Sequence, residues 1–175
     1  MKWQKLMIDS FDQVKTEAER MLDGLTRDEI LRQPHKDCNS IGWLVWHLTR
    51  VQDSSIAMMM GKEQLWVTGG WHKKFNRKAD PQDIGTGHSP EQVAAFRVPD
   101  TRTLVEYLRT VAERTEKYIS GLSASGLDKK LEDTPFQPPP LVGVYLVMVL
   151  SDNLQHVGQA GYVRGLVKGK GWQPW

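Results

Sequence analysis

The sequence predicts an all-α protein that folds as a four-helix bundle in a single domain over residues 1–175. Apolar residues recur with the 3.6-residue period of a helix in four segments of about twenty residues or more. No segment shows the sustained alternation of apolar and polar residues that marks a half-buried strand. A loop of about forty residues connects the second segment to the third. Because parallel neighbours require the chain to return along the bundle, roughly 30 Å for such helices, this long crossover loop predicts an up-down-down-up order.

The first helix is expected over about residues 3–23, where apolar residues keep the helical period. Gly24 follows directly and is the expected stop, because glycine readily adopts the backbone conformation that ends a helix. The sequence TRDE at residues 26–29 has the pattern of a capping box. It predicts one short extra helical turn, which must end before Pro34.

The second long helix is expected over residues 41–60, in a segment that begins IGWLVWHLTR. Ser40 precedes it as an N-cap residue, and Gly61 follows as a C-cap residue. His47 lies on the apolar face of this segment, which is the face expected to point into the bundle.

Residues 61–99 carry glycine, proline, aspartate and tryptophan without a sustained period. We expect a loop there, with one short helix near residues 71–75. The third long helix begins at Asp100 or Thr101, and its apolar positions continue to Leu122.

A connection rich in serine, glycine and proline, residues 123–140, leads to the fourth helix at about residues 141–167. The stretch LVGVYLVMVL at its start is compatible with a strand or a helix. A helix is favoured because the periodic pattern continues for four more turns. Asp152 and His156 then fall in the middle of this helix, where burial of a polar group costs several kcal/mol unless it has a partner.

One carboxylate and two imidazoles are expected inside the bundle. Asp152 and His156 are one turn apart, with Cβ atoms about 6 Å from each other, so both side chains can reach one ion. His47 can supply a third ligand from the second helix, whereas the remaining histidines fall in loops. The set is a 2-His-1-carboxylate group with coordination positions left for water or substrate. Spacing alone also permits an Asp152–His156 ion pair and a hydrogen-bonded core histidine, and by itself it favours these over a metal site.

The segments NSIGWLVWHLTRVQD and DNLQHVGQAGYVRGLVKG resemble the DinB superfamily of four-helix-bundle metalloenzymes. In that family a second-helix histidine follows the pattern x-S-I-x-W-L-x-x-H, and a fourth-helix H-x-x-x-H-x-G-Q supplies two more ligands. The middle segment, residues 69–100, is similar to the long loop of one DinB branch. By position the family ligands fall on His47, on His156 and on Asp152. Asp152 departs from the family pattern, which has its first fourth-helix histidine at this position.

The resemblance implies a divalent metal cofactor. Zinc is the default for histidine and carboxylate ligands, with nickel and iron(II) as alternatives. It also implies a small-molecule substrate and thiol-dependent transferase chemistry, in which the ion binds a low-molecular-weight thiol as thiolate. A metal-dependent hydrolase remains open, as does a stress-related metal- or ligand-binding protein without turnover. The predicted core offers no second acid or base group, which keeps the non-catalytic alternative in place, and no catalytic residue is assigned.

Three residue types near the predicted site each allow two interpretations. Gln159 either hydrogen-bonds to a metal ligand or packs against the neighbouring helix. Arg164 either binds an anion or interacts with a helix C-terminus. Trp66 and Trp71 either line the mouth of a pocket or hold the long loop in place.

Composition and charge exclude several classes of protein. A net charge of +2 is too small to predict a nucleic-acid or anionic-membrane partner. The longest apolar run, residues 141–150, is about half a membrane span. Cys38 is the only cysteine, which excludes an internal disulfide and is typical of a reducing compartment. The N-terminal sequence also lacks the apolar core of a secretory signal. We therefore expect a cytoplasmic protein, with its oligomeric state open between a monomer and a homodimer.

Overall fold

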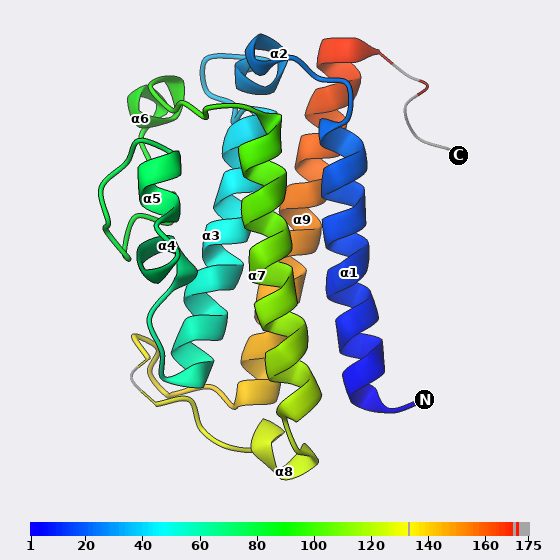
Figure 1. Ribbon diagram of the computed structural model, residues 1–175, viewed down its shortest axis with the longest axis vertical. Coiled ribbons are helices and arrows are strands. Elements are labelled where there is room, and N and C mark those ends of the chain that lie inside the picture. The colour runs from blue at the N-terminus through cyan, green and yellow to red at the C-terminus, as the bar shows by residue number, and fades with distance from the viewer. Residues whose placement is uncertain (133, 170, 172–175) are drawn as a thin grey trace.

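A computed structural model describes residues 1–132, 134–169 and 171 of the chain. Four long helices form the bundle shown in Figure 1: α1 (Trp3–Leu22), α3 (Ile41–Met60), α7 (Thr101–Gly121) and α9 (Val142–Lys168). Within those described residues there is no strand, only an isolated antiparallel bridge between Lys130 and Leu141. The predicted all-α four-helix bundle is confirmed.

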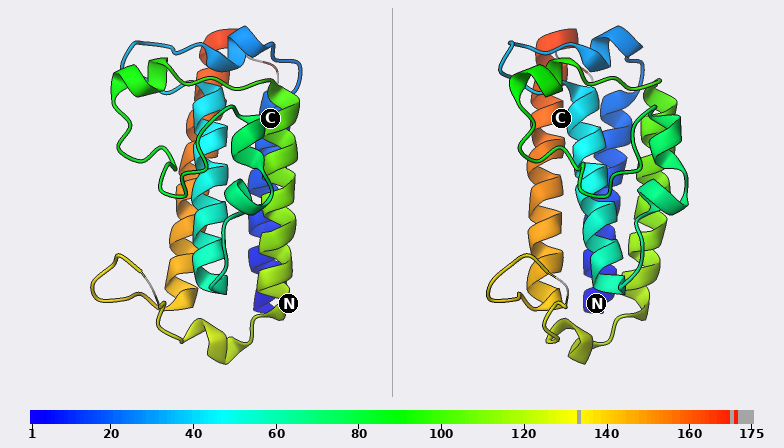
Figure 2. Two further views of the ribbon diagram at one scale, coloured as in Figure 1. Left: turned by 60° about the vertical axis from the view of Figure 1, so that its left-hand side comes forward. Right: turned by 90° about the vertical axis from the view of Figure 1, so that its left-hand side faces the viewer.

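The long helices have the predicted order. In Figures 1 and 2, α1 and α9 run upward while α3 and α7 run downward, so the second and third long helices are parallel. α3 packs against both α7 and α9, and α1 packs against the same two helices. The chain between α3 and α7 returns along the outside of the bundle. The long loop is therefore the connection that a parallel α3–α7 pair requires.

Three short helices lie in this crossover: α4 (Leu65–Thr68), α5 (Trp71–Lys74) and α6 (Pro90–Ala94). The predicted short helix near residues 71–75 corresponds to α5, whereas α4 and α6 were not predicted. Helices of four or five residues are too short to show a hydrophobic period. A readable signal for α6 does exist, because Ser89 and Gln92 form a capping box around a proline at the helix start.

The predicted caps of the first half of the chain are present. Thr26 and Glu29 form the capping box of α2 (Arg27–Leu31). The Ser40 hydroxyl accepts a hydrogen bond from the backbone N–H of Trp43 at 3.3 Å and so caps α3. Gly61 ends α3 in the left-handed conformation, with φ of 60°. A further short helix, α8 (Ala124–Leu127), interrupts the connection that was expected to be irregular.

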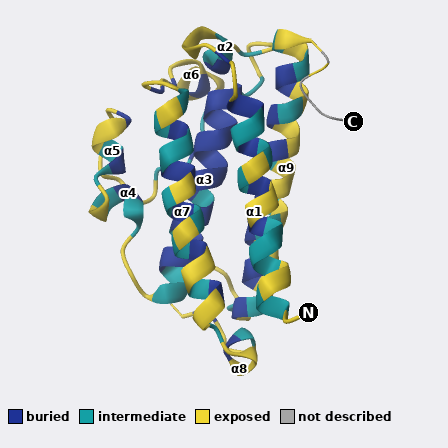
Figure 3. Cartoon of the chain, turned by 45° about the vertical axis from the view of Figure 1, so that its right-hand side comes forward, coloured by how far each residue is buried: buried dark blue, intermediate teal, exposed yellow. Residues whose placement is uncertain are grey.

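α3 is the central element of the bundle. Figure 3 shows it buried around most of its circumference, whereas α1 and α7 expose their outward faces. The crossover covers the side of α3 that the other long helices leave open (Figure 2). Trp66 and Trp71 pack into this core with 0% and 6% of their surface exposed, so they hold the loop in place and do not line an open mouth.

A buried polar network attaches the crossover to α3. The Asp53 carboxylate accepts hydrogen bonds from the backbone N–H groups of Leu65 and Trp66 at 2.9 and 2.8 Å. It also accepts one from the Tyr107 hydroxyl at 2.7 Å. Arg50, fully buried one turn earlier, places a guanidinium nitrogen 3.7 Å from the same carboxylate. The expectation that the core holds no further acid or base group was therefore wrong, although these groups serve the fold.

Arg50 also binds the far part of the crossover. Its guanidinium donates to the backbone carbonyl oxygens of Asp83 and Pro81 at 3.2 and 3.3 Å, and to the Gln64 side chain at 2.8 Å. These contacts join the guanidinium to the start of the crossover, at Gln64, and to its middle, at Pro81 and Asp83. The segment that follows Asp83 is thereby fixed against α3.

Arg164 of α9 stabilises the end of the first helix. It is buried and donates to the backbone carbonyl oxygens of Met21 and Asp23, the latter at 2.9 Å. Carbonyls at a helix C-terminus lack intrahelical donors and carry partial negative charge, so an arginine there completes the helix. These contacts favour the structural interpretation of Arg164 over an anion-binding role.

Across the part of the chain that is described, no helix combines the length and apolar character needed to cross a bilayer.

Candidate metal centre

His47, Asp152 and His156 converge between α3 and α9. Each residue offers one ligand atom, and the three atoms lie within 4.8 Å of one another. The His156 Nε2 atom is 3.5 Å from Asp152 Oδ1, and the two imidazole rings meet edge to face with centroids 4.6 Å apart. The antiparallel packing of α3 on α9 therefore brings together the residues that the sequence singled out.

The predicted position of these residues on α9 needs a correction. Asp152 and His156 were expected on the buried stripe of the helix, but both are only half-buried. The buried stripe instead passes through Asn153, Val157 and Ala160, with Asn153 fully buried. The candidate centre thus lies at the edge of the core, with His47 on its buried side and Asp152 and His156 nearer the solvent.

His47 is oriented by a backbone carbonyl of the crossover. Its Nδ1–H donates to the carbonyl oxygen of Ile84, since a carbonyl can only accept. This bond fixes the tautomer and leaves the lone pair on Nε2. The ring is also stacked on Trp43, with centroids 4.7 Å apart and planes 16° from parallel. In most metal sites a ligand histidine is oriented by a hydrogen bond from its other ring nitrogen, as the Ile84 carbonyl orients His47 here.

His156 is oriented in the same manner by a side chain of its own helix. Its Nδ1 atom lies 2.9 Å from the Gln159 Oε1 atom, which accepts the hydrogen bond. The remaining Nε2 atom then faces Asp152. Gln159 therefore contacts a candidate ligand, the first of its two predicted roles. Both imidazoles present Nε2 to the space between the three residues.

Burial and charge act on the two histidines in opposite directions. Burial is the main factor that lowers the pKa of His47, so this imidazole favours the neutral form that a metal requires. The hydrogen bond that the protonated His156 ring donates to the Asp152 carboxylate is the main factor that raises the pKa of His156. The group of one carboxylate and two imidazoles therefore favours added positive charge, which either a proton on His156 or a cation would supply.

One atom in the group favours a cation over a simple ion pair. The Asp152 Oδ2 atom is shielded from solvent and has no hydrogen-bond partner among the residues that the structure describes. A buried acceptor left in this state costs about 1–3 kcal/mol, and more when it is charged. A divalent ion bound by this carboxylate and the two Nε2 atoms would supply the partner. The donor set fits zinc, and it also fits nickel or iron(II).

Sequence reasoning missed the loop that holds His47. Gly85 has φ of 94°, and a Cβ atom there would lie 2.9 Å from His47 Nδ1 and 2.9 Å from the Trp46 ring. Only glycine allows the backbone to approach the His47 ring this closely. A backbone carbonyl has no side-chain signature, but the glycines within the sequence DIGTGH were the available signal.

A side-chain network holds the same loop from outside. His88, expected only as a loop histidine, accepts a hydrogen bond from Trp43 Nε1 at its Nδ1 atom, at 3.2 Å. Its Nε2–H donates to Asp83 at 3.0 Å, and Arg77 binds the other oxygen of the same carboxylate at 2.7 Å. The residues on either side of Ile84 are therefore anchored, which fixes the carbonyl that orients His47.

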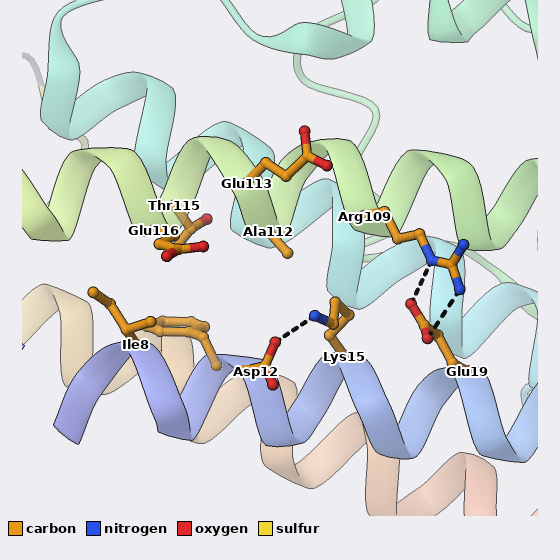
Figure 4. Close-up of a pocket in the computed structure, with 10 residues that line it drawn as sticks. Ile8, Asp12, Lys15, Glu19, Arg109, Ala112, Glu113, Thr115 and Glu116 are labelled. Atoms are coloured by element: carbon orange, nitrogen blue, oxygen red, sulfur yellow. Dashed lines mark hydrogen bonds and ion pairs between the residues drawn. The ribbon is translucent and has the colours of Figure 1, made fainter. Parts of the chain in front are cut away.

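A second pocket, between α1 and α7, lies apart from these residues. Figure 4 shows that its charged side chains largely pair with one another, as Asp12 does with Lys15 and Glu19 with Arg109. The Arg109–Glu19 contact is 2.8 Å long. Charges already neutralised in this manner give no reason to assign a ligand to the pocket.

The fold and the three converging side chains define a class of protein: a helical bundle with a candidate 2-His-1-carboxylate metal centre. The chain belongs to the DinB superfamily, whose sequence profile matches residues 10–160. A crystal structure of a conserved protein from Enterococcus faecalis has the same fold, with a TM-score of 0.88 and 29% sequence identity. The alignment covers 97% of this chain and 99% of that one. No functionally curated protein is similar in sequence.

Proposed function

We propose that this protein is a divalent-metal-dependent enzyme that transfers a low-molecular-weight thiol to a small-molecule electrophile. His47, Asp152 and His156 would hold the ion, with zinc favoured and nickel or iron(II) as alternatives. The proposal is supported chiefly by the convergence of three ligand atoms within 4.8 Å, one of them on a carboxylate with a buried, unpartnered oxygen among the described residues. Its chemistry follows the resemblance to the DinB superfamily.

The chain's own residues prepare the site for such chemistry. When bound, a divalent ion lowers the pKa of a coordinated thiol, so that thiolate is present at neutral pH. Three protein ligands leave coordination positions open for an incoming molecule. The Ile84 carbonyl and the Gln159 side chain hold the two imidazole rings in place. Neither ring therefore needs to move when a metal ion or a substrate enters the site. Asp152 supplies the negative charge that partly balances the cation.

The acid and base groups buried in the bundle are not available to assist chemistry at the candidate centre. Asp53 and Tyr107, the carboxylate and phenol buried in the bundle, bond to each other and to the crossover backbone. They are therefore not free to activate water at the centre. A thiolate is itself the nucleophile and needs no separate base. A metal-bound hydroxide would not need one either, so the choice of thiol transfer over hydrolysis comes from the resemblance to the DinB superfamily. A homodimer remains a prediction.

Substitution of the ligands tests the proposal. His156→Ala should lose both the ion and the transfer of thiol to a model electrophile. Asp152→His should keep the ion but shift the pH profile of transfer to lower pH. The carboxylate reduces the effective charge of the ion more than a neutral imidazole does, so a bound thiol should have a lower pKa in this variant.

The measurement is the rate of thiol transfer against pH, for several thiols and electrophiles, with metal-loaded and metal-free protein. Gln155→Ala is the matched control, because Gln155 is exposed on α9 next to His156. Turnover that persists in His156→Ala would refute the proposed site. A metal-loaded protein that accelerates no combination would favour the non-catalytic alternative.

A further inference from the structure

An apolar groove lies beside the candidate centre, between α3, α9 and the segment that connects α2 to α3. Its volume is about 450 Å³, within the range of small-molecule sites. Its lining is predominantly apolar and includes Pro34, Cys38, Leu44, Tyr162, Val163 and Leu166. None of the residues that line it carries a formal charge.

The groove and the candidate centre are contiguous. Gln159 lines the groove, and its Oε1 atom accepts the hydrogen bond from His156 Nδ1 at 2.9 Å. Leu44 lines the groove from α3, one helical turn before His47. A molecule in the groove would therefore lie about one helical turn, roughly 5 Å, along the bundle from the three candidate ligands.

The chemistry of the lining indicates what the groove accepts. A charged ligand would lose hydration there without gaining an oppositely charged partner, which is unfavourable by several kcal/mol. An uncharged apolar group would instead cover side chains that face water, since Tyr162 is 72% and Leu166 57% exposed. The opposite side of His47 is closed by the crossover, where the Ile84 carbonyl and Gly85 lie against its ring.

We propose that this groove binds an uncharged apolar small molecule or group, and that it holds the apolar part of the electrophile next to the candidate centre. The assignment of the occupant as substrate depends on the proposed function, whereas binding itself does not. Specificity then comes from α9, which carries two of the three candidate ligands, Asp152 and His156, and directly after them the groove residues from Gly158 onward.

Gly158 provides a substitution that fills the groove without disturbing the helix. It lines the groove, and a Cβ atom added there meets nothing within 4 Å. Gly165 is a matched control, because it lies on the same helix with equally open space but does not line the groove. Both changes replace a helical glycine by a better helix former, so each should maintain or raise stability. Gly158→Leu should block the groove, and Gly165→Leu should not.

The single cysteine provides a direct readout of occupancy, because Cys38 lines the groove and is partly exposed. The probe is N-phenyl-1-naphthylamine, a neutral apolar fluorophore, with a naphthalene disulfonate as the charged counterpart. The neutral probe should bind saturably and slow the alkylation of Cys38 by N-ethylmaleimide, and the charged one should not. Gly158→Leu should weaken binding of the neutral probe by at least about tenfold. Gly165→Leu should bind as the wild type does.

Two results would overturn the proposal. One is a neutral probe that leaves alkylation of Cys38 unchanged or binds Gly158→Leu as tightly as the wild type. The other is protection of Cys38 that grows with protein concentration in parallel with dimer formation in sedimentation, because a second copy would then cover the groove. His156→Ala separates the two proposals. If His156→Ala loses the metal but still binds the neutral probe, the groove is intact and independent of the metal. If the wild type binds metal but not the neutral probe, the groove proposal alone is refuted.

Discussion

Asp53→Ala is expected to destabilise the protein by about 3–5 kcal/mol, the range found when one partner of a buried ion pair is removed. The carboxylate is fully buried and accepts three hydrogen bonds, two from the crossover backbone and one from Tyr107. Guanidinium nitrogens of Arg50 and Arg114 lie 3.7 and 3.6 Å from it. Removal leaves buried donors unpaired and Arg50 without its counter-charge, so the free energy of unfolding in urea should fall accordingly.

Asp12→Ala is the control for the loss of a carboxylate. Asp12 is exposed on α1 and, among the described residues, pairs only with Lys15 at the surface, so its removal should cost about 0–1 kcal/mol. Asp53→Asn should give an intermediate loss, because an amide keeps one acceptor oxygen but no charge. If Asp53→Ala and Asp12→Ala unfold at the same urea concentration, the Asp53 network does not hold the crossover on α3.

Gly85→Ala is expected to weaken metal binding by about 10–100-fold, the usual effect of losing an outer-sphere partner of a ligand. A Cβ atom at this position would collide with His47 Nδ1 and with the rings of Trp46 and Trp43. The loop must then move outward, which takes the Ile84 carbonyl away from His47. The measurement is competition for Zn²⁺ with a chelator of known affinity. The visible spectrum of the Co²⁺-loaded protein reports any change in ligand geometry.

Gly87→Ala separates this collision from general backbone strain. Gly87 lies in the same loop at φ of 78°, but a Cβ atom there meets nothing within 4 Å. Both alanine variants therefore carry the strain of a left-handed residue, about 1–2 kcal/mol, and only Gly85→Ala displaces His47. Equal metal affinities for the two variants would mean that the Ile84 carbonyl does not position the ligand.

The long helices, their caps and their order were predictable because the signals are local. A 3.6-residue period, Ser40 before α3 and Gly61 after it each act within a few residues. The direction of α7 followed from the length of chain needed to reach its start. The grouping of His47, Asp152 and His156 was predictable because helical spacing puts two of them on one face and histidines were scarce in the other helices.

The burial of the candidate ligands was not predictable for a physical reason specific to α9. This helix is apolar on nearly all sides, with Val144, Val147 and Leu166 exposed, so its pattern does not define which stripe faces inward. The buried stripe was therefore placed about one residue away from its true position through Asn153. Packing against α1 and α3 determines which stripe of α9 faces the core. Such contacts between distant segments leave no local pattern in the sequence.

The crossover illustrates a second limit. The Asp53 carboxylate is bound by N–H groups twelve and thirteen residues away, and by Tyr107 still further along the chain. The His47 ring is held by a carbonyl thirty-seven residues later. Nothing in the sequence around any of these residues specifies its partner. Short helices such as α4 then form because the anchored backbone permits them, not because of their own propensity.

The metal content of the protein, purified without a histidine tag and incubated with Zn²⁺, Ni²⁺ or Fe²⁺ before removal of free metal, tests the central claim most directly. We expect one tightly bound divalent ion per chain in the wild type. His47→Ala should lose it, and His35→Ala, which changes an exposed loop histidine, should retain it. A wild-type protein that holds none of the three metals, or an ion that persists in His47→Ala, would contradict the assignment of His47, Asp152 and His156 as a metal centre.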